Sequence, residues 1–249
     1  LKERIAALGR AGTAQRPLIG DLIRPSEIVV LVIPIDKAAP KGRLILPQQM
    51  TIRGILDADG IPVCVKEDRL EELIGRLGSG ENGGAGNEPG LIITDSQVFE
   101  EVSKIVPDRI PLTSFSILMA RYKGFLDAAV RGVRKIDDLK DGDIVLISEG
   151  CTHHRQCGDI GTEKLPAWIR KRTGKKLLFE TSSGTGFPED LSRYAMVIHC
   201  GGCMLNEREM RFRMKCAADQ GIPFTNYGTA IAYMKGILDR SLQVVWRQE

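Results

Sequence analysis

The residue types best suited to metal chemistry gather in two short segments of the chain. One is Cys-Thr-His-His-Arg-Gln-Cys at 151–157, and the other is His-Cys-Gly-Gly-Cys at 199–203. Together they hold four of the six cysteines and all three histidines of the sequence. Thiolate and imidazole groups are ligands that zinc and iron–sulfur centres use in proteins. The clustering therefore predicts a metal site that both segments build.

The Cys-Gly-Gly-Cys segment suits a metal centre for a reason that lies in its backbone. Two glycines let the loop curl tightly, so that amide N–H groups approach the sulfur atoms of Cys200 and Cys203. A helix expected to start near Asn206 would add the positive end of its dipole. Both effects stabilise thiolates. With Cys151 the sequence offers three thiolates, one fewer than the four ligands of an iron–sulfur cubane.

Three kinds of protein are compatible with these residues. An iron–sulfur protein would use Cys151, Cys200 and Cys203 as ligands. The alternative is a zinc-stabilised α/β protein-interaction module, in which His153 joins the same three thiolates in tetrahedral ligation. A thiol oxidoreductase would use only Cys200 and Cys203, which leaves Cys151 and the histidines unexplained.

Both cysteine segments follow predicted strands, which end near Ile147 and Ile198. In open parallel sheets, ligands bind beyond the carboxyl ends of the strands. We therefore expect His153 and His199 to be neighbours in space. The hydroxyl of Ser182, which follows another strand, either lines the same pocket or belongs to an ordinary polar loop.

Strands alternate with helices along the chain, which predicts an α/β fold of two alternating α/β domains, with mainly parallel sheets flanked by helices. Strands are expected at 28–33, 61–65, 91–94, 143–147, 176–180, 194–198 and 222–225. Helices are expected at 44–56, 67–77, 97–105, 114–129, 166–173, 206–220 and 228–238. Prolines at 107 and 111 mark a boundary, which divides the chain into a linker remnant (1–16), a first domain (17–106) and a second domain (107–249).

Several polar and sulfur-containing residues have expected structural roles. Ser96, Ser114 and Asn206 are expected helix N-caps, since their short side chains accept hydrogen bonds from a first helical turn. Cys64 lies within a predicted strand and Cys216 within a predicted helix. Both are expected to be packed as small hydrophobic residues and not to bind metal.

Composition and charge exclude several classes of protein. The 249 residues are 43% apolar and 27% charged, as in soluble globular domains. The net charge is only +3, so neither nucleic acid nor an anionic membrane is an expected partner. The longest aliphatic run, 28–33, is far shorter than the roughly 18 residues of a membrane span. The N-terminus shows no export signal, so reduced thiols and a cytoplasmic location are expected.

At the two cysteine segments the sequence resembles the HydF family, the GTPase and scaffold proteins that mature FeFe-hydrogenase. The family's pattern of Cys-x-His, a long gap and His-Cys-x-x-Cys falls on Cys151, His153, His199, Cys200 and Cys203. Supporting stretches lie at 17–23, 39–48, 94–99, 111–116 and 159–161. The resemblance covers residues 17–249.

The resemblance implies a 4Fe–4S cluster held by Cys151, Cys200 and Cys203, with a diiron precursor carried as cargo. It implies a homodimer that works with radical-SAM maturases and passes the precursor to apo FeFe-hydrogenase. Members of the family begin with a GTPase domain, whereas this sequence contains no Gly-x4-Gly-Lys-Ser/Thr loop. The chain is therefore expected to be a scaffold and carrier in hydrogenase maturation and not an enzyme.

The fourth ligand of the cluster stays open among several groups. His153 and His199 either ligate iron or donate hydrogen bonds around the site. Cys157 follows Cys151 by six residues and is another candidate. The remaining alternatives are an acidic residue such as Asp159 and an open or solvent-filled position.

Overall fold

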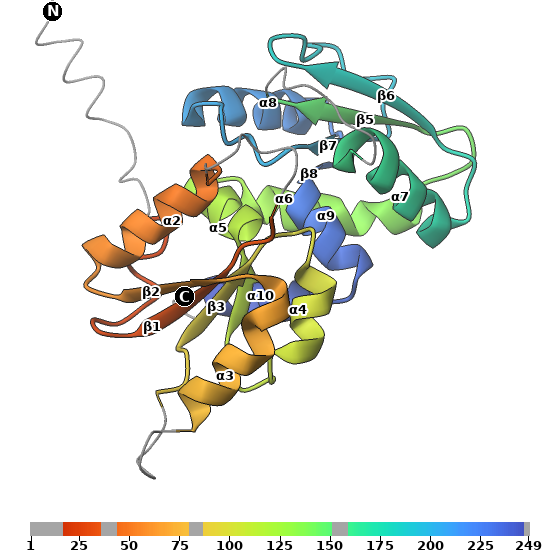
Figure 1. Ribbon diagram of the computed structural model, residues 1–249. Coiled ribbons are helices and arrows are strands. Elements are labelled where there is room, and N and C mark those ends of the chain that lie inside the picture. The colour runs from red at the N-terminus through yellow and green to blue at the C-terminus, as the bar shows by residue number, and fades with distance from the viewer. Residues whose placement is uncertain (1–16, 36–43, 80–86, 151–158, 247–249) are drawn as a thin grey trace, which may run out of the picture.

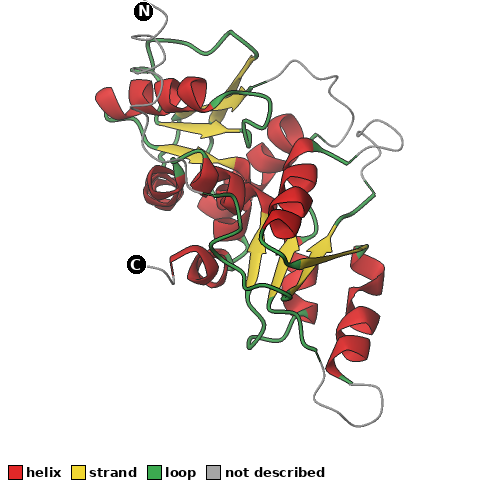
Figure 2. Cartoon of the chain, turned by 90° about the vertical axis from the view of Figure 1, so that its left-hand side faces the viewer, coloured by secondary structure: helices red, strands yellow, loops and turns green. Residues whose placement is uncertain are grey.

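A computed structural model of the chain describes residues 17–35, 44–79, 87–150 and 159–246. It contains two four-stranded parallel sheets with helices packed around and between them (Figure 1). The two sheets form separate groups of strands in the side view of Figure 2. The predicted fold class, alternating α/β with parallel sheets flanked by helices, is confirmed.

The first sheet has the strand order β2-β1-β3-β4. Its strands are β1 (Ile28–Val32), β2 (Ile61–Val65), β3 (Leu91–Thr94) and β4 (Leu112–Ser114). The helices of this part are α2 (Leu46–Asp57), α3 (Leu70–Gly78), which follows the turn η1 (Glu67–Arg69), and α4 (Phe99–Ile105). The continuous aliphatic run of β1 is buried at the centre of the sheet, as expected for a parallel strand covered on both faces.

The second sheet has the equivalent order β6-β5-β7-β8. Its strands are β5 (Ile144–Glu149), β6 (Leu178–Ser183), β7 (Met196–His199) and β8 (Phe224–Asn226). The π-helical turn η3 (Ile160–Lys164) leads into α7 (Leu165–Thr173), and α8 (Glu207–Asp219) connects β7 to β8.

One pair of helices follows the last strand of each sheet. The pairs are α5 (Phe115–Tyr122) with α6 (Leu126–Val133), and α9 (Tyr227–Met234) with α10 (Leu238–Trp246); the turn η2 (Arg134–Asp138) extends α6. The sequence predicted a single helix at 114–129 and did not predict β4 or α10. Gly124 and Gly236 have φ angles of 75° and 73°, the left-handed conformation that ends a helix. Each predicted helix therefore stops there, and a second helix begins.

The second half of the chain is a structural repeat of the first. Residues 110–127 align without a gap on 222–239 and share Ile-Pro, Thr, Ala, Lys-Gly and Leu-Asp. Ser114 and Asn226 occupy equivalent positions in this alignment. Each side chain accepts a hydrogen bond from a backbone N–H in the first turn of its helix. The expected cap at Ser114 is confirmed.

The last helix of each half packs on the sheet of the other half, α6 against β8 and α10 against β4. The Thr225 hydroxyl on β8 donates to the Ala129 carbonyl in α6 at 2.9 Å. A Cβ atom at Gly132 would lie 2.0 Å from the Phe224 carbonyl oxygen, so α6 approaches β8 this closely only with glycine. This reciprocal crossing joins the two sheets into one unit.

Three expectations from the sequence differ from the observed fold: the cap at Ser96, the packing of Cys64 and the domain boundary at 106. Ser96 does not cap α4, whose N-cap is Val98; its hydroxyl instead lies 2.8 Å from that of Ser116. Cys64 is exposed on the edge strand β2 and not packed, while Cys216 is half-buried against the core. β4 lies beyond the predicted domain boundary at 106 yet pairs with β3. The helices in the described ranges are all too short or too polar to cross a bilayer.

The crossing predicts that Gly132→Ala destabilises the protein. The added methyl group would meet the Phe224 backbone, and overpacking of this kind costs about 1–3 kcal/mol. We expect a lower urea midpoint of unfolding, followed by circular dichroism. Gly75→Ala in α3 is the matched control, because its Cβ would have no atom within 4 Å; it should stabilise the helix by about 0.5–1 kcal/mol. Equal midpoints for the two variants would contradict the crossing geometry.

Candidate metal centre

The strands that precede the two cysteine segments lie side by side and end at the same edge of the second sheet. β5 and β7 are parallel, and their register pairs Ser148 with His199. Beyond the strand end, the Cys200 N–H donates to the Ser148 carbonyl at 2.7 Å. The strands that lead to the two segments therefore end as neighbours, whereas the expected proximity of His153 and His199 stays a prediction.

The sulfur atom of Cys200 lies among backbone N–H groups. The Gly150 N–H donates to Cys200 Sγ at 3.1 Å, and the Gly202 N–H donates to the same atom at 3.4 Å. Such donors favour a thiolate over a thiol. Gly150 directly precedes Cys151 in the sequence. The backbone that leads into the first cysteine segment thus contacts a sulfur atom of the second.

Two glycines make this close approach possible. Gly202 has a φ angle of 60°, and a Cβ there would lie 2.5 Å from Met210 Sδ. A Cβ at Gly150 would lie 2.7 Å from Leu205 Cγ, so Leu205 packs directly on the backbone that leads to Cys151. Past the loop, Asn206 caps α8 by accepting from the Glu209 N–H at 2.8 Å, which confirms the predicted cap.

His199 is fully buried and has partners at both ring nitrogens. Nδ1 lies 2.7 Å from the Cys200 carbonyl oxygen, and Nε2 lies 3.1 Å from Arg213 Nη1. Because a guanidinium group can only donate, Nε2 accepts, and Nδ1 carries the proton that it donates to Cys200. Burial lowers the pKa of His199 to about 4, so the ring is neutral. This arrangement favours a hydrogen-bonding role for His199 over iron ligation.

Arg213 is a buried cation that sequence reasoning missed. Its Nε donates to Glu209 Oε1 at 2.7 Å and its Nη2 to the Gly184 carbonyl at 2.6 Å, while the guanidinium lies over the Phe187 ring. Together with the bond to His199, these contacts tie α8 to the ends of β7 and β6. The sequence feature that could have indicated its burial is helical spacing, because Arg213 lies on the same buried face of α8 as Met210 and Ala217.

Lys123 is a second buried cation that the sequence did not reveal as part of the site. It follows α5 in the first half of the chain, and its Nζ donates to the carbonyl oxygens of Gly202 and Leu205. Burial lowers its pKa, while the thiols of Cys203 and then Cys200 act in the opposite direction. The ammonium group therefore lies in the electrostatic field of the cysteine loop.

Further polar groups lie at the same edge of the sheet. Glu149, buried at the end of β5, accepts a 3.3 Å hydrogen bond from the Tyr227 hydroxyl. Burial raises the pKa of Tyr227, and Glu149 and Cys200 raise it further. Asp159 accepts hydrogen bonds from the Thr162 N–H and hydroxyl, so its carboxylate caps the turn η3. The Ser182 hydroxyl donates to Ser148 Oγ at 3.0 Å, which bridges β6 to β5.

The residues that the structure describes supply only part of the predicted ligand set. Cys200 and Cys203 are half-buried in the loop after β7. Cys151, His153 and Cys157 lie outside the described residues, so their roles stay predictions. Within the described ranges, no three His, Cys, Asp or Glu side chains group closely enough to hold a metal ion. The prediction of a metal site therefore also depends on segment 151–158, which lies outside the described residues.

The donor groups present fit an iron–sulfur centre. Two thiols share a loop, backbone N–H groups donate to one sulfur atom, and a buried ammonium lies close by. Iron–sulfur cores are anionic and are stabilised by such donors and charges.

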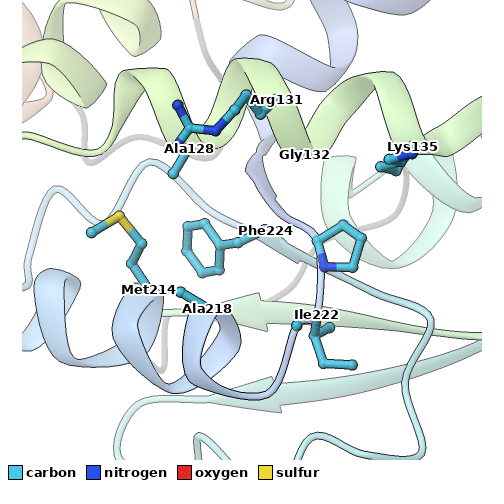
Figure 3. A pocket seen from close by; sticks show the side chains of 10 residues that line it. Ala128, Arg131, Gly132, Lys135, Met214, Ala218, Ile222 and Phe224 are labelled. Atoms are coloured by element: carbon cyan, nitrogen blue, oxygen red, sulfur yellow. The ribbon is translucent and has the colours of Figure 1, made fainter.

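A separate pocket of about 250 Å³ opens between α6, α8 and β8 (Figure 3). Phe224, Met214 and Ile222 form much of its apolar lining, and Arg131 and Lys135 add two cations. None of its lining residues is a cysteine or histidine. It is therefore distinct from the cysteine site.

Fold and site together define a doubled parallel α/β protein with two half-buried cysteines, Cys200 and Cys203, at the carboxyl edge of its second sheet. The hydrogen maturase F dimerization domain matches residues 18–124, and the hydrogen maturase F tetramerization domain matches residues 127–244. The chain belongs to the hydrogen maturase F (HydF) family. A comparison with curated proteins found no match.

The family match places the chain in hydrogenase maturation, in a scaffold role, and in a class of proteins that form oligomers. The two matched regions meet between residues 124 and 127, where the chain passes from α5 to α6. Lys123 therefore belongs to the dimerization region, whereas Cys200 and Cys203 belong to the tetramerization region.

The contacts of Arg213 predict that Arg213→Met weakens the fold around the site. The substitution leaves the His199 ring, the Glu209 carboxylate and the Gly184 carbonyl without a buried donor, at a cost of about 2–4 kcal/mol. Urea unfolding measures the loss. Lys215→Met on the same helix removes only an exposed ion pair with Asp219 and should change stability by less than about 0.5 kcal/mol. A similar loss for both variants would refute the role of Arg213.

Proposed function

We propose that the chain is a scaffold that binds a 4Fe–4S cluster through Cys151, Cys200 and Cys203. The observation that supports it most is the hydrogen bond from the Gly150 N–H to Cys200 Sγ. It joins the backbone next to Cys151 to a sulfur atom that lies 50 residues further along the chain. The family match supports the same function.

Residues around the loop prepare the chain for this role before any cluster is present. His199, as a neutral ring, holds the Cys200 carbonyl, and Arg213 holds His199 in turn. Lys123 adds positive charge beside the cysteine loop. These groups fix the backbone and offset the negative charge that three thiolates would bring.

The cluster, when bound, supplies an iron with an exchangeable position that can accept a bridging ligand from a diiron unit. We propose that the diiron precursor is the cargo, received with radical-SAM maturases and passed to apo FeFe-hydrogenase. In this function the chain binds and transfers and is not an enzyme. We further propose that it works as a homodimer in the cytoplasm. The dimerization-domain match supports the homodimer.

Anaerobic reconstitution with iron and sulfide tests the cluster directly. We expect about four iron and four sulfide per chain in the wild type, since a cubane has that composition. Cys151→Ala, Cys200→Ala and Cys203→Ala should each lose most of the bound iron. The matched controls are Cys64→Ala, exposed on β2, and Cys216→Ala, half-buried on α8; both should bind iron as the wild type does.

Metal analysis of the same samples includes zinc. One tightly held zinc per chain, without a stable cluster, would refute the scaffold and support the zinc-stabilised interaction module instead.

The fourth ligand is tested by EPR spectra of the reduced cluster. Because both ring nitrogens of His199 have partners, His199→Gln should leave the g values unchanged even if it lowers stability. An altered spectrum in this variant would show that His199 ligates iron. Parallel spectra of His153→Ala, Cys157→Ala and Asp159→Asn separate the remaining candidates. Unchanged spectra in all three indicate an open or solvent-filled position.

A further inference from the structure

Lys123 connects the first half of the chain to the cysteine loop of the second. Its Nζ donates to the carbonyl oxygens of Gly202 and Leu205, the latter at 2.9 Å. These two residues are the ends of one turn, which the Leu205 N–H closes by donating to the Gly202 carbonyl at 3.0 Å. A single ammonium group thus spans the turn that contains Cys203.

The charge of Lys123 lacks a carboxylate partner in the described part of the chain. Lys123 as a whole residue is only 5% exposed, and the two carbonyl groups are neutral. Buried charges are ordinarily paired, because an isolated charge loses its hydration. Cys203 and Cys200, whose thiols carry negative charge only when ionised, are the groups that raise the pKa of this ammonium. The position therefore suits a cation that faces thiolates or an anionic cluster.

The internal repeat provides a direct comparison. Lys235 is the residue equivalent to Lys123, and it also reaches the other half of the molecule. There its Nζ pairs with Glu100 Oε2 on α4 at 2.6 Å, and its side chain is half-exposed. Lys235 thus pairs with a carboxylate of the first half, whereas Lys123 binds the backbone of the cysteine loop in the second half.

We propose that Lys123 is a positioning residue of the metal centre, which clamps the Gly202–Leu205 turn and places positive charge beside Cys200 and Cys203. The nature of the bound group rests on the proposed function, whereas the clamp does not. Since Lys123 lies in the dimerization region, the ligand site of the tetramerization region is incomplete without the domain that precedes it.

The clamp is tested on the full chain without metal by hydrogen exchange of the amides at 201–206. In Lys123→Met the loop should exchange about tenfold faster, because two hydrogen bonds to a charged donor are lost. Lys123→Arg keeps a cationic donor and should remain closer to the wild type. Lys235→Met is the matched control and should leave this loop unchanged. Unchanged exchange in Lys123→Met would refute the clamp.

The charge is tested on the reconstituted protein by the midpoint potential of the cluster. A nearby cation favours the reduced, more negative state, so Lys123→Met and Lys123→Gln should both lower the potential. Lys123→Gln retains donor N–H groups, which makes it useful if the Met variant folds poorly. Lys123→Arg and Lys235→Met should keep the wild-type potential. Equal potentials in all variants would overturn the electrostatic role.

The two proposals fail in different ways. If the wild type binds no cluster, the scaffold function fails, while faster loop exchange in Lys123→Met still supports the clamp. If the wild type binds its cluster and the Lys123 variants match it in exchange and potential, only the role of Lys123 is refuted.

Discussion

The parallel pairing of β5 with β7 is the constraint on which the rest of the site depends. Its register sets Ser148 beside His199 and so brings Gly150 within hydrogen-bond distance of Cys200 Sγ. A slip of one residue would turn the His199 ring to the opposite face of the sheet and remove it from Arg213. The close packing of Leu205 on Gly150 depends on the same register. One strand pairing therefore assembles a ligand site from two distant segments.

Two buried cations stabilise this edge of the sheet by different means. Arg213 has a carboxylate partner in Glu209 and uses its other donors on a neutral histidine and a backbone carbonyl. Among the residues that the structure describes, Lys123 has only carbonyl groups as direct partners, and the two thiols raise its pKa. The first cation fixes the residues around the loop, and the second places a positive charge near the two cysteines of the loop.

The repeat explains why residues of one half serve the site of the other. α6 crosses to β8 and α10 crosses to β4, so the chain segments beside Gly124 and Gly236 lie between the two sheets. Lysines at equivalent positions 123 and 235 therefore both reach across, yet they meet different partners. The two halves therefore share a fold but differ in the loops at the ends of their strands, and these loops determine what each lysine contacts.

The sequence by itself determined the alternating strands and helices, the position of a strand before each cysteine segment, and caps such as Ser114 and Asn206. These features follow from short-range periodicity and from strand direction in a parallel sheet. Three-residue β4 carries too little periodic pattern to be recognised, and Gly124 ends its helix inside an otherwise helical pattern. Only the tertiary structure decided the roles of His199, Arg213 and Lys123. Lys123 and Gly202 are 79 residues apart, and a contact at that distance arises from packing, which local sequence patterns do not encode.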